Sequence, residues 1–402
     1  MSLDLKFVRS QFPALASDWA FFDNAGGSQV LKSVADRITD YLMNTNVQTG
    51  ASYSISQKAS DRLSEARSRI ALLVNAAMPE EVIFGPSTTI LMRFLATAMA
   101  SQLSVGDEII LTNFDHESNI GPWLTLMERG IKFKFWHIDP LALDVGLEQL
   151  GQLITKRTKL VCVTHTSNIL GTINPIRKIA DYVHERGARI CVDGVAFAPH
   201  RAIDVQALNV DYYLFSFYKT YGPHFAMLYG RHAHLLELDG LYHYFYGKEK
   251  IPGKMEPGNP NYELAWGTAG IVDYFEQLGG GKGRSSIVAA FEKIAKHEAA
   301  IGERLLGWLR QRNGVRIIGS PSSDKNLRVP TISFVVEGHD ASDIVKKIDP
   351  FKIGIRHGDF HSRRLIESLG LSPQGVIRVS MVHYNSLEEV DKLKDALGLA
   401  LQ

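Results

Sequence analysis

Ile190-Cys191-Val192-Asp193-Gly194 is an apolar run that ends in an aspartate, and a second apolar run, Tyr212-Tyr213-Leu214-Phe215-Ser216, leads into Phe217-Tyr218-Lys219. Lys219 follows Asp193 by 26 residues. Continuous apolar runs of this length are typical of strands that are buried on both faces of a parallel sheet. Ligands bind beyond the carboxyl ends of the strands in such sheets, and both residues are expected there.

A lysine and an aspartate at this place are the two groups that a pyridoxal phosphate (PLP) enzyme requires. The lysine amine forms a Schiff base with the cofactor, and the carboxylate keeps the pyridine nitrogen protonated so that the ring accepts electrons. Taken alone, a strand-end Asp193 and a surface Lys219 explain the pattern equally well.

Strands and amphipathic helices alternate through the middle of the chain, which predicts an α/β fold with a parallel sheet and crossover helices. A second pattern of short strands and helices after residue 281 predicts a smaller α+β domain. We therefore expect a large domain over residues 21–281 and a small domain formed by residues 1–20 and 282–402. The expected strands are 107–112, 131–136, 158–164, 189–193, 211–216, 329–336 and 375–381, and the expected helices are 90–100, 175–185, 285–312, 341–348 and 387–399.

The bulk composition is that of an ordinary globular protein with more than one domain. The 402 residues carry 44 Lys and Arg against 43 Asp and Glu, which gives no electrostatic reason to expect nucleic acid or an anionic membrane. No apolar run reaches the roughly 18–20 residues of a membrane span, and no signal peptide is visible at the start. Cys162 and Cys191 both lie in apolar runs, so we expect buried thiols, no metal site and a cytoplasmic location.

Hydroxyl groups gather where a phosphate could bind. Ser87, Thr88 and Thr89 precede the helix expected at 90–100, and a helix N-terminus with nearby hydroxyls binds phosphate well. Ser216 and Tyr218 place two more hydroxyls beside Lys219. The alternative is that Ser87 or Thr88 only caps the helix.

Polar residues at other strand ends add to the candidate site. His116 could stack on a flat cofactor ring and move protons, although it could also be an exposed loop histidine. Asn168 could donate to an oxygen of the cofactor, or could simply belong to a turn. Arg378, on the strand expected at 375–381, could bind a substrate carboxylate with two hydrogen bonds, or could form a structural salt bridge.

Together these motifs resemble the class V aminotransferase group of fold type I PLP enzymes, in particular its cysteine desulfurase-like branch. The similarity runs from Phe21-Phe22-Asp23-Asn24-Ala25 nearly to the C-terminus, and its most specific part is Asp193-Gly194 with Ser216–Pro223. The resemblance implies a large domain with a mostly parallel, seven-stranded type of sheet, a smaller C-terminal α+β domain, PLP as cofactor and a small-molecule amino acid as substrate.

By position, the resemblance implies a role for each motif residue. Lys219 forms the Schiff base, Asp193 pairs with the pyridine nitrogen, and His116 stacks on the ring. Arg378 binds the substrate α-carboxylate, with His361 and Asn24 also on the substrate side. The remaining residues meet the ring hydroxyl (Asn168), hold the phosphate (Thr88, Thr89, Ser216 and Tyr218), or reach the phosphate of a neighbouring subunit in a homodimer (Asn259).

The chain also departs from the family pattern. Tyr218 stands where the motif usually has histidine, Asn259 where it has threonine, and Ala196 where it has glutamine. Gln48 and Thr49 stand where desulfurases commonly carry histidine and arginine. The largest departure is the loop Gly358-Asp359-Phe360-His361-Ser362, which contains no cysteine although desulfurases place a sulfur-accepting cysteine there.

The expected activity is therefore a C–S lyase or β-elimination type of reaction without a persulfide cysteine. A class V aminotransferase uses the same lysine, ring and carboxylate anchor, so this alternative stays open, as does a desulfurase that uses another sulfur acceptor. A non-catalytic binding protein is disfavoured because a binder has no need for the Schiff-base lysine, Lys219.

Overall fold

The computed structural model describes residues 3–402, so residues 1 and 2 of the predicted small domain lie outside it. Its centre is a seven-stranded sheet with strand order β2-β8-β7-β6-β5-β3-β4. β8 is antiparallel to both of its neighbours, and the other four pairings are parallel. The strands are β2 (Val82–Gly85), β3 (Glu108–Thr112), β4 (Lys132–Trp136), β5 (Thr158–Thr164), β6 (Arg189–Asp193), β7 (Tyr212–Ser216) and β8 (Ala226–Gly230).

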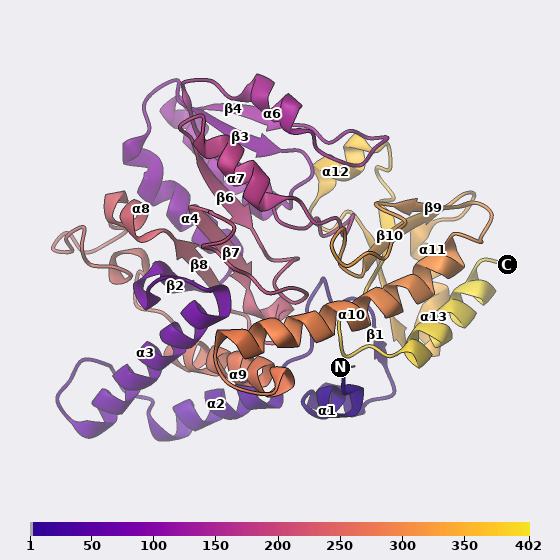
Figure 1. The fold of residues 1–402 in the computed structure, drawn as a ribbon, viewed down its shortest axis with the longest axis horizontal. Helices are drawn as coiled ribbons and strands as arrows, with labels where there is room; N and C mark the ends of the chain where they lie inside the picture. The colour runs from indigo at the N-terminus through magenta and orange to yellow at the C-terminus, as the bar shows by residue number, and fades with distance from the viewer. Residues whose placement is uncertain (1–2) are drawn as a thin grey trace.

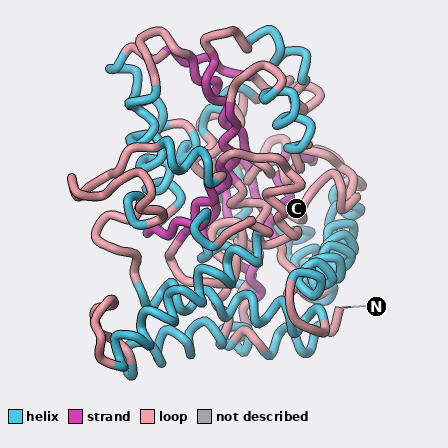
Figure 2. Tube along the Cα trace, turned by 60° about the vertical axis from the view of Figure 1, so that its left-hand side comes forward, coloured by secondary structure: helices cyan, strands magenta, loops and turns pink. Residues whose placement is uncertain are grey.

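The central strands are apolar throughout because helices cover both faces of this sheet. In β6, Ile190 and Val192 join one hydrophobic core, whereas Cys191 joins the core on the opposite face. Figure 2 shows the strands running through the middle with helices on either side. Helix α4 (Thr88–Met99) supplies Leu91 and Leu95 to the core that contains Cys191. The mostly parallel sheet and its crossover helices are confirmed.

A layer of three helices lies on the other side, at the bottom of Figure 1. It consists of α2 (Lys32–Asn44), α3 (Ser54–Val74) and α9 (Tyr262–Gly279). Asp273 of α9 ties the layer together by ion pairs with Arg37 of α2 and Arg69 of α3, both at 2.6 Å. The shorter helices of this part of the chain are α5 (Gly121–Leu124), α6 (Leu147–Leu153), α7 (Ile176–His184) and α8 (His232–Glu237).

The C-terminal part, at the right of Figure 1, has its own antiparallel sheet of order β12-β13-β10-β9. The strands are β9 (Val315–Ile318), β10 (Thr331–Val336), β12 (Arg356–Gly358) and β13 (Val376–Ser380), and the helices are α11 (Ala341–Ile348), α12 (Arg363–Ser368) and α13 (Leu387–Ala400). A smaller α+β unit is therefore present, as predicted.

The N-terminal segment joins this C-terminal unit. After α1 (Leu5–Ser10), strand β1 (Ala20–Phe21) pairs in parallel with β11 (Ile353–Gly354). The long helix α10 (Arg284–Leu309) packs against both α9 and α13, and so connects the two parts of the molecule. The domain limits at residues 20 and 281 stay a prediction. No helix among residues 3–402 is both long and apolar enough to cross a membrane.

Candidate active site

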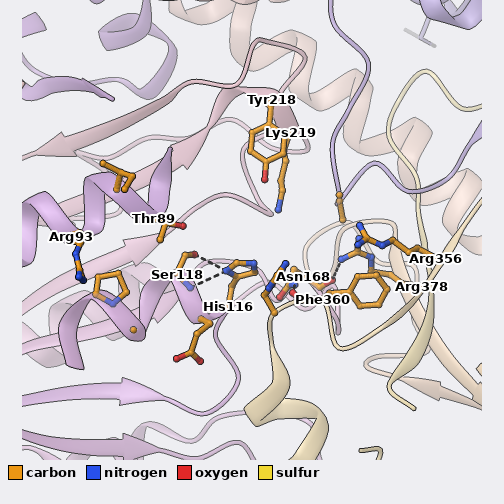
Figure 3. Close-up of a pocket in the computed structure, with 17 residues that line it drawn as sticks. Thr89, Arg93, His116, Ser118, Asn168, Tyr218, Lys219, Arg356, Phe360 and Arg378 are labelled. Carbon is orange, nitrogen blue, oxygen red and sulfur yellow. Dashed lines mark hydrogen bonds between the residues drawn. The ribbon is translucent and has the colours of Figure 1, made fainter. Parts of the chain in front are cut away.

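A cavity of about 720 Å³ opens at the carboxyl ends of the central strands, and a narrower recess of about 80 Å³ continues beside it. Lys219, His116 and Asn168 line both spaces. Figure 3 shows Lys219 entering from one side and His116 from the other, with Arg356 and Arg378 at the end of the cavity remote from Thr89 and Arg93. Ten of the twelve residues predicted for the site line one space or the other: Thr88, Thr89, His116, Asn168, Asp193, Ser216, Tyr218, Lys219, His361 and Arg378.

Lys219 ends a short 3-10 turn that follows β7 directly. Burial and, next, the charge of Arg378 lower the pKa of its amine to about 8, while the charge of Asp193 acts in the opposite direction. A larger fraction of this amine is therefore neutral at pH 7 than of an ordinary lysine, as a nucleophile requires.

Asp193 is the last residue of β6, beside Leu214 of β7, and is buried. Burial raises the pKa of its carboxyl to about 6, although the backbone N–H of Val195 donates to Oδ1 at 2.9 Å and opposes this rise. The next residue must be glycine, since a Cβ on Gly194 would lie 2.1 Å from the ring of Tyr213. Asp193 is therefore held at the floor of the recess by a tight local packing.

Two hydroxyl groups meet at the N-terminus of α4. The Thr88 and Ser216 hydroxyl oxygens are 2.6 Å apart, and the Thr88 N–H donates to the Ser216 Oγ at 3.3 Å. Ser87 is the helix cap, because its Oγ accepts from the Ile90 N–H at 3.2 Å. The capping role thus falls to Ser87, and Thr88 lines the recess beside the first turn of the helix. Helix α4 begins at Thr88, two residues earlier than predicted.

His116 is held in one orientation by its neighbour. The backbone N–H of Ser118 donates to Nδ1 at 3.1 Å, so the neutral ring carries its proton on Nε2. Burial and then the charge of Lys219 lower the pKa of His116 to about 3, so the ring is neutral at pH 7. Its ring centre lies 5.3 Å from that of His361.

Asp115 is a buried carboxyl that the sequence did not single out. Burial raises its pKa to about 7, although hydrogen bonds from Thr112 and Asn119 oppose the rise, and the charge of Asp193 is a smaller cause in the same direction as burial. It accepts hydrogen bonds from the Asn119 Nδ2 at 3.0 Å and from the Thr164 N–H at 3.2 Å, and so connects the ends of β3 and β5. In the sequence, only its position next to His116 indicated that Asp115 could belong to the site.

The loop from Gly358 to Ser362 is bound to the central sheet beside the cavity. Asn168 Nδ2 donates to the Phe360 carbonyl at 3.0 Å, and the Ser362 hydroxyl donates to the Asn168 Oδ1 at 2.8 Å. The Glu117 N–H donates to the His361 carbonyl at 2.8 Å. Phe360 and His361 both have positive φ, 50° and 59°, a strained conformation for residues other than glycine. Asn168 therefore holds this loop, a contact that the sequence did not predict.

Arg378 lies at the centre of β13, opposite Arg356 of β12, and both line the cavity. The Arg378 Nη2 donates to the Asp23 carboxylate at 2.8 Å. The salt bridge weighed as the alternative for Arg378 is therefore present, and the arginine lines the cavity as well.

The other two predicted residues lie elsewhere. Asn24, predicted on the substrate side, is buried outside the cavity: its Nδ2 donates to the carbonyls of Phe21 and Ser380, both at 2.8 Å. It fixes the segment after β1 to β13, and its role on the substrate side stays a prediction. Asn259 is exposed and, in the single chain, lies outside both spaces.

The thiols of Cys162 and Cys191 are buried in the core under α4 and line neither space. Burial raises the pKa of the Cys162 thiol well above its usual value, which disfavours the reactive thiolate. Among residues 3–402, no group of three or more His, Cys, Asp or Glu side chains is arranged to hold a metal ion.

The sequence profile of the aminotransferase class-V family matches residues 20–393. The chain belongs to the class V aminotransferase family. Enzymes of this family and the cysteine desulfurases within it depend on PLP, so the predicted cofactor and enzyme class are confirmed.

Curated relatives cover the whole chain. The aminotransferase-like protein FGM3 of Gibberella zeae is 45% identical, with 100% of this chain and 99% of that protein aligned. The cysteine desulfurase-like protein ustD of Aspergillus flavus is 34% identical over 96% of this chain and 88% of its own length. A probable cysteine desulfurase of Halobacterium salinarum is 32% identical, covering 100% and 97%.

Solved structures agree with this assignment. A cysteine desulfurase from Thermococcus onnurineus superposes with a TM-score of 0.89 at 26% identity, covering 100% of this chain and 98% of the other. The cysteine desulfurase CsdA of Escherichia coli gives 0.85 at 26% identity, covering 100% and 99%. The fold type I PLP enzyme architecture is therefore confirmed.

Proposed function

We propose that this class V enzyme is a lyase that breaks a bond to the β-substituent of an amino acid without passing sulfur to a cysteine of its own. The observation that carries the proposal is the loop from Gly358 to Ser362. Within residues 3–402, this loop brings His361 to the cavity, and no thiol lines it. An imidazole accepts and donates protons but does not form a persulfide.

The side chains of the recess suit the cofactor. The Thr88 and Ser216 hydroxyls beside the N-terminus of α4 provide donors for a phosphate, and Asp193 provides a buried carboxylate for a ring nitrogen. Lys219, with its lowered pKa, provides the amine for the aldehyde. PLP supplies an electron sink for negative charge that develops at the substrate Cα.

The residues of the chain would then divide the other tasks. Lys219 would be the base that takes the proton from the substrate Cα, since its pKa of about 8 lies near neutrality. His116 holds a proton on Nε2 at neutral pH, and this N–H is available to the reacting groups. Arg378 binds the α-carboxylate of the substrate.

Other charged side chains line the cavity besides Arg378. They include Arg93, Arg356 and Glu117, and Asp23 lies 3.7 Å from the Arg356 Nη1. The Arg356 side chain is 59% exposed, whereas that of Arg378 is 2% exposed, so Arg356 is the more accessible of the facing pair. The accessible Arg356 favours substrates whose side chain also bears a carboxylate, so cysteine conjugates that carry a carboxylate belong in any substrate panel.

The experiment incubates the PLP-loaded enzyme with L-cysteine and with cysteine conjugates, including conjugates that carry a carboxylate, with and without added 2-keto acids. Pyruvate that forms together with ammonia and a released thiol supports the proposal. Conversion of the cofactor to pyridoxamine phosphate, with turnover that requires an added keto acid, would instead support the aminotransferase alternative.

A second experiment separates the lyase from a desulfurase that uses its own thiol. The double variant Cys162→Ser, Cys191→Ser should keep most of its kcat/KM, after allowance for lost packing, because neither thiol reaches the cavity. His361→Ala should reduce kcat/KM more strongly. Loss of activity in the cysteine variant, together with a persulfide trapped on either thiol of the parent, would restore the desulfurase assignment.

We also propose that the active unit is a homodimer. Asn259 is exposed and lies outside the cavity of its own chain, as expected of a residue that reaches the phosphate site of a neighbouring subunit. Asn259→Ala should weaken PLP retention without unfolding the chain. An active monomer with full PLP occupancy in sedimentation would contradict the proposal.

A further inference from the structure

Arg378 is a buried cation that three groups hold in place. Its side chain is 2% exposed. Nη2 donates to Asp23, Nη1 donates to the Asn168 carbonyl at 3.3 Å, and the guanidinium carbon lies 3.7 Å from the centre of the Phe360 ring. Nε has no partner among the described residues. A buried guanidinium donor without a partner is costly, so Arg378 keeps one N–H that no described protein group satisfies.

Asp23 meets two arginines that face each other. Arg356 and Arg378 are directly opposite on β12 and β13, and like charges at such positions repel. Asp23 lies 2.8 Å from the Arg378 Nη2 and 3.7 Å from the Arg356 Nη1, so one carboxylate offsets both charges. Burial lowers the pKa of Arg378, and the charge of Asp23 counteracts this effect.

Asp23 has little freedom to leave this position. A Cβ on Gly26 would lie 2.8 Å from the Asp23 Oδ2, so the backbone of the next turn closes one side of the carboxylate. Backbone pairing between Asp23 and Ser380 joins its segment to β13, the strand that carries Arg378. The carboxylate and the guanidinium are therefore fixed to the same part of the small α+β unit.

Phe360 completes the enclosure. Its ring covers one face of the Arg378 guanidinium, and a cation over an aromatic face is stabilised most where water is excluded. The Asn168 hydrogen bond to the Phe360 carbonyl keeps the ring there despite the positive φ of this residue.

We propose that Asp23 and Phe360 are positioning residues that hold Arg378 in the orientation in which it binds the carboxylate of the substrate. Asp23 stays paired with Arg378 when the substrate binds, and Phe360 keeps the guanidinium dry. This inference rests on the proposed role of Arg378 and adds two residues that act through it.

The test measures how strongly the PLP-loaded enzyme distinguishes an acid from the matching amine. The probes are 2-aminoisobutyrate and tert-butylamine, in which a methyl group replaces the carboxylate. Neither has a hydrogen on the carbon that bears the amine, so both stop at binding. Calorimetry gives the ratio of their dissociation constants for the parent, Asp23→Asn, Phe360→Leu and Arg378→Gln. Asp18→Asn is the matched control, since Asp18 forms an exposed ion pair with Lys352 at the junction of the same two segments.

Asp23→Asn should weaken 2-aminoisobutyrate binding about tenfold or more, in line with the loss of a charged hydrogen-bond partner, and leave the binding of tert-butylamine within about twofold. Phe360→Leu should shift the ratio in the same direction by a smaller factor, and Asp18→Asn should not shift it. If Asp23→Asn does not fold, the ratio of dissociation constants in Phe360→Leu tests the positioning role by itself.

Each contrary outcome has a distinct meaning. An unchanged ratio in Arg378→Gln would refute the assignment of Arg378 itself and, with it, this part of the proposed function. A lowered preference for the acid in Arg378→Gln, together with an unchanged ratio in Asp23→Asn and Phe360→Leu, would refute only the positioning role. Tighter 2-aminoisobutyrate binding in Asp23→Asn would show that Asp23 competes with the substrate, which also overturns the inference.

Discussion

The lowered pKa of Lys219 makes a quantitative prediction about how the protein takes up its cofactor. With a pKa of about 8 rather than 10.5, about one amine in ten is neutral at pH 7, against about one in three thousand for an unperturbed lysine. Only the neutral amine attacks the aldehyde of PLP. The rate of cofactor uptake by the cofactor-free protein should therefore rise with pH, pass its midpoint near pH 8 and then level off.

Arg378→Gln perturbs this midpoint in a known direction. Burial is the first cause of the low pKa of Lys219 and the charge of Arg378 is the second, so removing this charge should raise the midpoint above 8. Arg93→Gln is the matched control, because Arg93 lines the same cavity but is not among the main charges that act on Lys219. Stopped-flow absorbance across pH 6 to about 10.5 measures the profile. A parent midpoint near 10.5, or a midpoint that falls in Arg378→Gln, would refute the argument.

Three further predictions concern the floor of the site. Borohydride reduction of the PLP-loaded protein should fix the cofactor on Lys219, as peptide mass spectrometry will show, and a label on another lysine would overturn the assignment. Asp193→Asn should fold and retain cofactor but turn over several orders of magnitude more slowly, on the order of a few kcal/mol or more in activation free energy; near-normal kcat would mean that Asp193 is only structural. Gly194→Ala forces a methyl group against the ring of Tyr213 and should lower the free energy of unfolding, measured by urea denaturation, by about 1–3 kcal/mol or more. The control Gly146→Ala, where a Cβ meets open space, should change the free energy of unfolding far less.

Strands buried on both faces were predictable from the sequence. Residues 158–164 and 189–193 form β5 and β6 with the expected limits, because each apolar run ends where the chain leaves the sheet. The four-residue β2 and the neighbouring β8 were not predicted. Their place in the sheet depends on antiparallel pairing between segments far apart in the chain, which a local pattern does not specify.

Helix α9 was also missed, for a different physical reason. Its glycines lower the local helix propensity, yet they let the helix approach α2 closely. A Cβ on Gly267 would lie 2.6 Å from Ile38, and a Cβ on Gly270 would lie 2.9 Å from the backbone of Ser33. Tertiary packing therefore determines this helix against its own composition.

The residues of the candidate site were likewise predictable only in part. Lys219 and Asp193 were predictable because Asp193 ends one strand and Lys219 follows another after a short turn, and parallel strands bring their carboxyl ends to one edge. The role of Asp23 was not predictable, because it depends on the hydrogen bond from Arg378, which lies 355 residues away in the chain. The motif alone predicted Asn24, the neighbour of Asp23, on the substrate side. In the structure, the Asn24 amide donates to the carbonyls of Phe21 and Ser380 and so joins β1 to β13.

Backbone hydrogen bonds hold the loop around His361 beside the cavity. The contacts that hold the loop at positions 360 and 361 are made to backbone carbonyls: Asn168 donates to that of Phe360, and the Glu117 N–H donates to that of His361. Neither hydrogen bond depends on which side chain stands at position 361. The side chain at position 361 can therefore change without loss of these two hydrogen bonds, and the loop can stay beside the cavity.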